Sequence, residues 1–331
     1  MQRVHIEMPK LARRFALALI CATAIVGTAA AQGYPKRPVT IVVPFPPGAA
    51  TDTFARAAAR SMASQLGHNF IADNRAGASG RIGTDQVARA APDGHTLLWG
   101  SSGPLVITPV WGEKPPYDTL RDFAPVSLFA KIPFILVVHP SVPAKSLKEL
   151  VSVIHAKPGK LTYASSGVGG TSHLAGELFK SLAKVDLLHV PYKGTALFAT
   201  ELIAGQVDMA FAGPTTTLPH IQTGRMRAIA ITSTERVPLV PQIPTIAEAG
   251  VPGYEFTQWY ALLAPAKTPR EIVAILNAAL LKSMHDSDVK ARVGSEGGVF
   301  TPQTPEQFSA FLSTELQKNA KTIRDAGLKR E

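Results

Sequence analysis

Short apolar runs rich in β-branched residues alternate along this chain with longer segments in which apolar residues recur at helical spacing. Gly, Pro and polar residues separate the two kinds of segment and mark the expected turns. The runs predicted as strands are Val39–Val43, Phe70–Asp73, Thr96–Trp99, Phe134–Val138, Leu161–Ala164, Leu187–Val190, Val207–Phe211 and Ala228–Ile231. Strands that alternate with helices favour an α/β fold with mainly parallel sheets.

Several of the intervening helices carry end signals. Ser146 with Glu149, and Thr268 with Glu271, fit the capping box of a helix N-terminus. Gly205 and Gly224 fit the glycine that follows a helix C-terminus.

The first predicted strand ends in a turn suited to an anion. After Val43 the chain continues as Pro-Phe-Pro-Pro-Gly48 and reaches Thr51 and Asp52, which are good N-cap residues for the Ala-rich helix that follows. A helix N-terminus offers unpaired backbone N–H groups and a partial positive charge, so it can bind a carboxylate or a phosphate. The same pattern also fits an ordinary strand-to-helix connection.

A second turn of this kind follows the strand at Leu161–Ala164. A Ser/Gly loop leads into a helix opened by Thr171 or Ser172. The loop Gly100–Gly103 adds further hydroxyl and backbone N–H groups after the third strand. Because ligands of open α/β sheets bind outside the carboxyl ends of the strands, these loops are expected to line one cleft.

The N-terminus has the pattern of a secretory signal peptide. Arg13 and Arg14 close a basic region, Phe15–Val26 is apolar, and Ala29–Ala31 supplies the small residues of a cleavage site. The apolar run is shorter than the roughly 20 residues that a transmembrane helix needs. Residues 1–31 are therefore predicted to be removed, and the mature protein is expected in the periplasm.

We predict cleavage after Ala31, which leaves Gln32 as the first mature residue, because Ala29 and Ala31 lie three and one positions before that bond. N-terminal sequencing of the exported protein tests this. A mature chain that still contained Arg13 and Cys21 would contradict it.

Composition narrows the function classes. The formal net charge is +10, but the cations are dispersed and no basic stripe is interleaved with aromatic residues, which argues against nucleic-acid binding. The one cysteine, Cys21, lies in the predicted signal peptide. The mature chain therefore has no disulfide, thiolate metal ligand or cysteine nucleophile.

No motif predicts catalysis. Gly77–Arg81 lacks the last glycine of a nucleophile elbow, and Gly167–Thr171 lacks the lysine of a phosphate-binding P-loop. The histidines include no H-x-x-x-H pair of metal-binding spacing, and His173 points away from the neighbouring Ser172 on a helix. We expect no enzymatic activity, no metal and no cofactor.

Nine segments in order carry a family resemblance: PFPPGAATD, ADNRAGASGRIG, AAPDGHTLL, YDTLRDFAPVSL, KPGKLTYASSGVGGTSHLAGELF, HVPYKGTA, LPHIQTGRMRAIA, IPTIAEAGVPGYE and LLAPAKTP. Together they resemble the Bug family, the TctC-like substrate-binding receptors of tripartite tricarboxylate transport. The resemblance covers essentially everything after residue 33.

This resemblance implies an α/β fold of the periplasmic binding protein type II kind, with two lobes joined by two crossover strands. Lobe 1 would comprise residues 32–133 and 255–331, and lobe 2 residues 134–254. The crossings would lie at Ala130–Pro133 and Val251–Glu255, two extended segments punctuated by proline. Such strands can act as a hinge. Alternatively, they are surface loops of a single doubly wound domain.

The turns and the resemblance together indicate the substrate-binding residues. They are Phe45, Gly48, Ala49, Ala50, Thr51, Asp52, Ser101, Ser102, Ser165, Ser166, Gly167, Thr171, Ser172, His173, Lys193, Asp208 and Ala212. Asp52 can also be only a helix cap, and Lys193 only a solvated side chain. Phe45, Phe211 and Trp259 are candidates to cover an apolar part of the ligand.

Two positions depart from the family pattern. Ala49 replaces a glycine, which argues against a positive φ at this position. Ala212 stands where many relatives have Asp, so a partner for a ligand ammonium group is missing, and amino acids should bind less tightly than plain carboxylates.

The expected function is that of an exported, monomeric receptor that captures a small carboxylate between its lobes and presents it to membrane permease subunits. An exported hydrolase and a ligand-sensing receptor for signalling are the alternatives. The first would need a catalytic triad or metal site that the sequence does not show.

Overall fold

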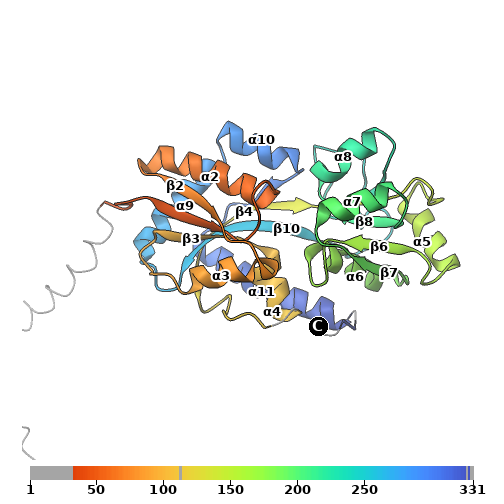
Figure 1. Ribbon diagram of the computed structural model, residues 1–331, viewed down its shortest axis with the longest axis horizontal. Coiled ribbons are helices and arrows are strands. Elements are labelled where there is room, and N and C mark those ends of the chain that lie inside the picture. The colour runs from red at the N-terminus through yellow and green to blue at the C-terminus, as the bar shows by residue number, and fades with distance from the viewer. Residues whose placement is uncertain (1–32, 112–113, 326, 329–331) are drawn as a thin grey trace, which may run out of the picture.

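Figure 1 shows two α/β halves side by side in a computed structural model that describes residues 33–111, 114–325 and 327–328. Within these residues the first half contains a six-stranded sheet in the order β11-β4-β10-β3-β1-β2. Its strands are β1 (Val39–Val43), β2 (Phe70–Asn74), β3 (Thr96–Ser101), β4 (Phe123–Pro133), β10 (Thr257–Pro265) and β11 (Val299–Phe300). Strands β2, β1 and β3 are parallel, whereas β10 is antiparallel to both β3 and β4.

The second half contains a five-stranded sheet, counted over the same described residues, in the order β7-β6-β8-β5-β9. Its strands are β5 (Ile135–Val138), β6 (Thr162–Ser165), β7 (Leu188–Pro191), β8 (Met209–Ala212) and β9 (Arg227–Ile231). Strands β7, β6 and β8 are parallel, and β5 is antiparallel to β8 and β9. The prediction of mainly parallel sheets therefore misses two antiparallel strands. These are β10 in the first sheet and β5 in the second, and the chain reaches each of them directly after it leaves the other half.

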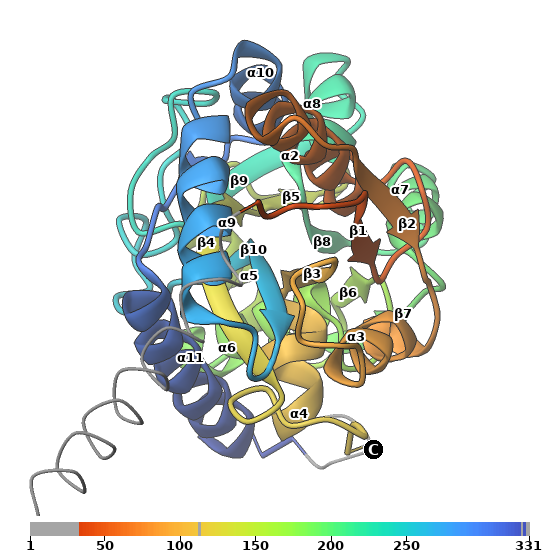
Figure 2. The same cartoon turned by 90° about the vertical axis from the view of Figure 1, so that its left-hand side faces the viewer.

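Helices cover both faces of the sheets, as the end-on view in Figure 2 shows for the first half. Helices α2 and α10 lie on one face of the first sheet, and α3, α4 and α11 on the other. The helices of the first half are α2 (Ala50–Leu66), α3 (Arg81–Ala88), α4 (Thr108–Val110), α9 (Arg270–Ser283), α10 (Ser287–Ser295) and α11 (Pro305–Asp325), with the short turns η1 (Ala78–Gly80) and η2 (Gly103–Ile107). Those of the second half are α5 (Leu147–Ala156), α6 (Thr171–Ala183), α7 (Thr195–Ile203) and α8 (Pro214–Gln222).

The chain passes between the sheets at two adjacent crossings. Strand β4 ends at Pro133 and β5 begins at Ile135, so Phe134 lies between the two sheets. On the return, Phe256 donates its N–H to the carbonyl of Thr232 (2.9 Å), and Phe134 donates to the Thr232 hydroxyl (2.7 Å). The rings of Phe134 and Phe256 stack with centroids 6.0 Å apart. Hydrogen bonds and aromatic packing thus hold the two crossings together.

Some of the predicted end signals are confirmed and one is wrong. Ser146 caps α5 by accepting the Glu149 N–H, and Gly205 and Gly224 adopt positive φ after α7 and α8. Thr268 does not cap α9: its hydroxyl donates to the Pro265 carbonyl at 2.7 Å, and the helix starts only at Arg270.

No helix within the described ranges is long and apolar enough to cross a membrane. The predicted signal peptide and its cleavage point lie outside the described residues.

Candidate functional site

The N-terminus of α2 follows β1 directly. The helix begins at Ala50 with Ala49 as its N-cap, so Thr51 and Asp52 are first-turn residues and the prediction that either caps the helix is wrong. The positive φ of this turn falls on Gly48 (90°), whereas Ala49 has φ −76°. Alanine at position 49 therefore causes no backbone strain.

Asp52 shapes this turn. Its buried carboxylate accepts hydrogen bonds from the Gly48 N–H (3.0 Å), Arg56 Nε (3.0 Å) and Asn74 Nδ2 (2.9 Å). Burial alone would raise the pKa of Asp52, but these hydrogen bonds, with Arg56 foremost, hold the pKa below its usual value. An ionised Asp52 thus fixes the loop that presents the helix end.

The second turn leads from β6 to the N-terminus of α6. Thr171 is the first helical residue and Gly170 the N-cap, so neither Thr171 nor Ser172 caps the helix as predicted. Instead, the buried Ser172 hydroxyl accepts the N–H of Ser166 at 3.0 Å. The N–H groups of the first helical turn have no acceptor within the helix and are available to an anion.

Strand β10 links these two helix ends, with side-chain hydrogen bonds on the α6 side. The Thr171 hydroxyl donates to Gln258 Oε1 (3.3 Å), and Gln258 Nε2 donates to the Tyr260 hydroxyl (2.6 Å). Burial raises the pKa of Tyr260, and the neighbouring Thr51 side chain, in the first turn of α2, lowers it in part. Residues 258 and 260 share one face of the strand because side chains alternate. The two turns predicted to form a cleft are therefore brought together.

A third helix end is occupied by the protein's own carboxylate. Glu296, which follows α10 in the first half, accepts the Thr215 hydroxyl (2.6 Å) and N–H (3.4 Å) in the first turn of α8, in the second half. Only 8% of Glu296 is exposed, and this burial raises its pKa although the Thr215 hydrogen bonds lower it in part. No local sequence pattern marks Glu296, because its partner lies 81 residues away along the chain.

Several predicted residues lie around these ends. Ser101 and Ser102 are buried where β3 turns into η2, and Ala212 ends β8 immediately before Gly213, the N-cap of α8. Lys193 is exposed in the loop after β7. Phe45 is half-buried in the turn before α2.

Asp208 is a wrong prediction. It precedes β8 rather than ending it, and its carboxylate accepts the N–H (2.7 Å) and hydroxyl (2.8 Å) of Thr162 at the start of the parallel strand β6. Since a strand rises about 3.3 Å per residue, Asp208 lies roughly 13 Å from Ala212, at the opposite end of the sheet.

Phe211 and Trp259 cannot cover a ligand as predicted, because both side chains are fully buried in the core. Trp259 packs against Phe308 of α11 and donates its indole N–H to Glu315. Phe211 stacks on Tyr254. In each strand the neighbouring residues point to the other face, which is why Gln258 and Tyr260 reach the cleft side and Trp259 does not.

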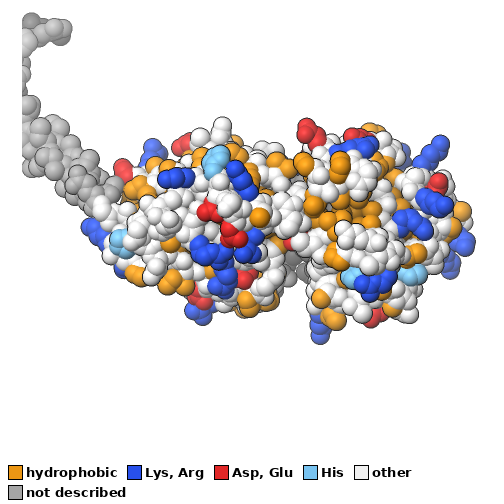
Figure 3. Space-filling view, turned by 90° about the horizontal axis from the view of Figure 1, so that it is seen from above, with side chains coloured by type: hydrophobic (Ala, Val, Ile, Leu, Met, Phe, Trp, Pro, Cys, Tyr) orange, Lys and Arg blue, Asp and Glu red, His pale blue; other side chains and the backbone are white. Residues whose placement is uncertain are grey.

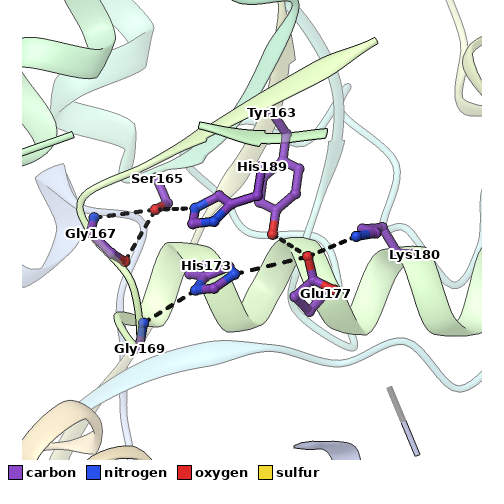
Figure 4. A network of polar contacts seen from close by, with 8 residues as sticks. All are labelled: Tyr163, Ser165, Gly167, Gly169, His173, Glu177, Lys180 and His189. Carbon is purple, nitrogen blue, oxygen red and sulfur yellow. Dashed lines mark hydrogen bonds and ion pairs between the residues drawn. The ribbon is translucent and has the colours of Figure 1, made fainter. Parts of the chain in front are cut away.

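His173 lies beneath the loop before α6 rather than on its surface, unlike the direct ligand contact predicted for it. Its ring is 6% exposed and stacks on that of His189, with centroids 3.6 Å apart and an interplanar angle of 10°. Figure 4 shows both rings turned toward the loop, where His173 Nδ1 accepts the Gly169 N–H (3.2 Å). Ser165 and Gly167 belong to the same network.

A cavity of about 680 Å³ lies elsewhere, on the second half between the start of α5 and β9. Another, of about 30 Å³, is lined by Ser102 and by residues of α6 and α11. Among the described residues no group of three or more His, Cys, Asp or Glu side chains is placed to hold a metal ion. Figure 3 shows that the surface is indented between the two halves.

Two α/β lobes joined by paired crossings, with helix N-termini converging at the junction, define a two-lobed solute-binding protein. The chain belongs to the family described as "Tripartite tricarboxylate transporter family receptor", which residues 54–328 match. It is 36% identical to Protein BugT of Bordetella pertussis over 311 residues, covering 94% of this chain and 95% of that protein.

Two solved structures resemble it closely. Rpa4515 of R. palustris, solved with adipate, is 35% identical with a TM-score of 0.81, over 89% of this chain and 98% of that one. MatC of Rhodopseudomonas palustris, with bound malate, is 35% identical with a TM-score of 0.77, over 88% and 100% of the two chains. The resemblance to TctC-like Bug receptors and the two-lobed fold are thereby confirmed.

The contact between Glu296 and Thr215 predicts that the lobes are held together without ligand. A hydrogen bond to a charged group contributes about 1.5–3 kcal/mol, so its loss should shift the balance between open and closed forms by tenfold or more. Thr215→Val and Glu296→Gln should each enlarge the ligand-free radius of gyration in small-angle scattering, whereas Thr216→Val serves as a matched control. Superimposable curves for all four proteins would contradict this role.

Proposed function

We propose that this protein is an exported receptor that binds a small carboxylate between its lobes and delivers it to the membrane subunits of a tripartite transporter. The observation that carries the proposal is that hydrogen bonds run from Thr171 through Gln258 to Tyr260, beside Thr51, so that β10 sets the N-termini of α6 and α2 against one another. Relatives solved with adipate and malate support the ligand class.

Helix N-termini suffice for this affinity. Micromolar binding corresponds to about −8 kcal/mol, and several hydrogen bonds to a carboxylate of roughly 1.5–3 kcal/mol each reach it after the cost of ordering is subtracted. The backbone N–H groups near Ala50 and Thr171, with the hydroxyls of Ser101 and Ser166, are the donors we assign. No proton transfer is required, and we infer that the receptor acts without catalysis.

The lobes divide as residues 32–133 with 255–331, and 134–254, in our assignment. The paired crossings at Phe134 and Phe256 then form the hinge. The receptor would act as a periplasmic monomer, and ligand would favour the closed form by binding both helix ends together.

Carboxylate recognition predicts a ranking of ligands. Acids should stabilise the protein more than their amides, and plain dicarboxylates more than amino acids, because Ala212 offers no negative charge to an ammonium group and Glu296 is engaged with Thr215. A thermal-shift panel of adipate, malate, adipamide, aspartate and glutamate measures this. Equal stabilisation by amide and acid would refute carboxylate recognition, and a preference for aspartate would refute the argument from Ala212.

The Thr171 hydroxyl should matter to affinity more than to folding. Thr171→Val removes the hydrogen bond to Gln258 and should weaken binding of the best acid of that panel by about tenfold, the equivalent of one net hydrogen bond. Thr171→Ser keeps the hydroxyl and should bind nearly as the parent protein does, by calorimetry. If the valine variant binds equally well, backbone groups alone act at this helix end.

A further inference from the structure

Two histidines, His173 and His189, anchor the loop that precedes α6 through hydrogen bonds. Gly169 donates its N–H to His173 Nδ1 (3.2 Å), and Gly167 donates to Ser165 Oγ (3.2 Å). The Ser165 hydroxyl in turn lies 2.7 Å from His189 Nε2. Figure 4 shows that these contacts reach the loop at two points, Gly167 and Gly169.

The two rings form one packed unit. Besides stacking on each other, His189 stacks on Tyr163 of β6 (4.9 Å between centroids) and His173 packs against Trp111 (4.5 Å). The unit therefore connects the loop to β6, β7 and the segment after α4. A loop rich in glycine has high conformational freedom, so such anchoring is needed to keep its N–H groups aimed at a ligand.

The contact with Gly169 fixes the proton on His173. A backbone N–H can only donate, so Nδ1 must be unprotonated and the proton of the neutral ring lies on Nε2. That nitrogen is 3.9 Å from Glu177 Oε1, which also accepts hydrogen bonds from the Tyr163 hydroxyl and from Lys180 Nζ (3.0 Å). The ionisable groups that surround the His173 ring are Tyr163, Glu177, Lys180 and His189.

We propose that His173 is a positioning residue for the carboxylate site, whose neutral ring accepts the Gly169 N–H and, stacked on His189, fixes the loop that opens α6. It touches no ligand and acts through the loop. This role rests on the proposed function. It assigns to His173 the selection of the loop conformation that binds the ligand.

The electrostatic environment agrees with a neutral pair. Burial, with smaller contributions from His189 and Lys180, lowers the pKa of His173 to about 3, and burial lowers that of His189 to about 4. In the unfolded chain both would titrate near pH 6.5. The unfolded state therefore binds more protons below that pH, so this contribution to stability is full above about pH 6.5 and is lost as the pH falls toward 4 and 3.

The test compares His173→Asn with His173→Leu. The asparagine amide oxygen can take the place of Nδ1 as acceptor, whereas leucine fills the space without accepting. His155→Asn, at an exposed histidine of α5, is the control. Amide hydrogen exchange should show Gly169 protected in the parent protein and in His173→Asn, and exchanging at least tenfold faster in His173→Leu.

Adipate is the binding probe. His173→Leu should bind it about tenfold more weakly than the parent, and His173→Asn should restore most of that affinity. In the parent protein, nitrogen NMR should show His173 protonated on Nε2 alone at pH 7. Between pH 6.5 and 4, the unfolding free energy of the parent should fall more steeply than that of His173→Asn.

A proton on Nδ1, or unchanged Gly169 exchange in His173→Leu, would overturn the anchoring. Faster exchange with unchanged affinity for adipate would overturn the positioning role while leaving the proposed function intact. Failure of the parent protein to bind any acid of the panel would overturn the proposed function, and this role with it, whatever the exchange result.

Discussion

The antiparallel pairing of β10 with β4 and β3 is the interaction on which the rest of the structure depends. Its register runs from Thr257 opposite Pro133, at the crossing, to Pro265 opposite Phe123. One face of β10 carries Gln258 and Tyr260 to the helix ends, and the other buries Trp259 against α11. A single strand thus sets both the packing of the C-terminal helix and the polar junction of the lobes. A shift of one residue would exchange these two faces.

The helix N-termini at the junction differ in the side chains that contact them. At α8 a carboxylate from the opposite lobe, Glu296, already receives the hydrogen bonds that an anion would take. At α2 the charge of Asp52 is directed back to Gly48 and Arg56, so it organises the turn without filling the helix end. At α6 a neutral histidine, and not a carboxylate, accepts the hydrogen bond that supports the loop. The three helix N-termini thus differ in what surrounds them: the end of α8 binds a carboxylate of the protein itself, whereas the turns before α2 and α6 are held in place by neighbouring side chains.

The sequence predicted well those features that depend on neighbouring residues. The bounds of β1, the capping of α5 by Ser146 and the glycine stops at 205 and 224 all follow from local hydrogen bonding and hydrophobic alternation. Asp208 was grouped with the carboxyl end of its strand although it stands second in the predicted run Val207–Phe211, and in the structure it precedes β8, which begins at Met209.

Features that depend on distant partners could not be predicted in this way. Strand β4 carries Pro125 and Lys131 among its apolar residues and so shows no clean period, and the direction of β10 is set by where the chain returns. Glu296 has no local signal because its partner, Thr215, belongs to the other lobe. The two turns that lead into helix N-termini indicated a binding site, but side-chain alternation along the strands decides which neighbours face it.

The position of β10 in the sheet has a consequence for the order of assembly. This strand lies between β3 and β4, yet it is the last of the three to be synthesised, after the whole of the second half. Until the ribosome has made residue 265, the edges of β3 and β4 that pair with β10 have no partner, so the first sheet cannot form completely in the growing chain. Contacts of such long sequence separation form slowly. The first sheet therefore acquires its native strand order only late in synthesis.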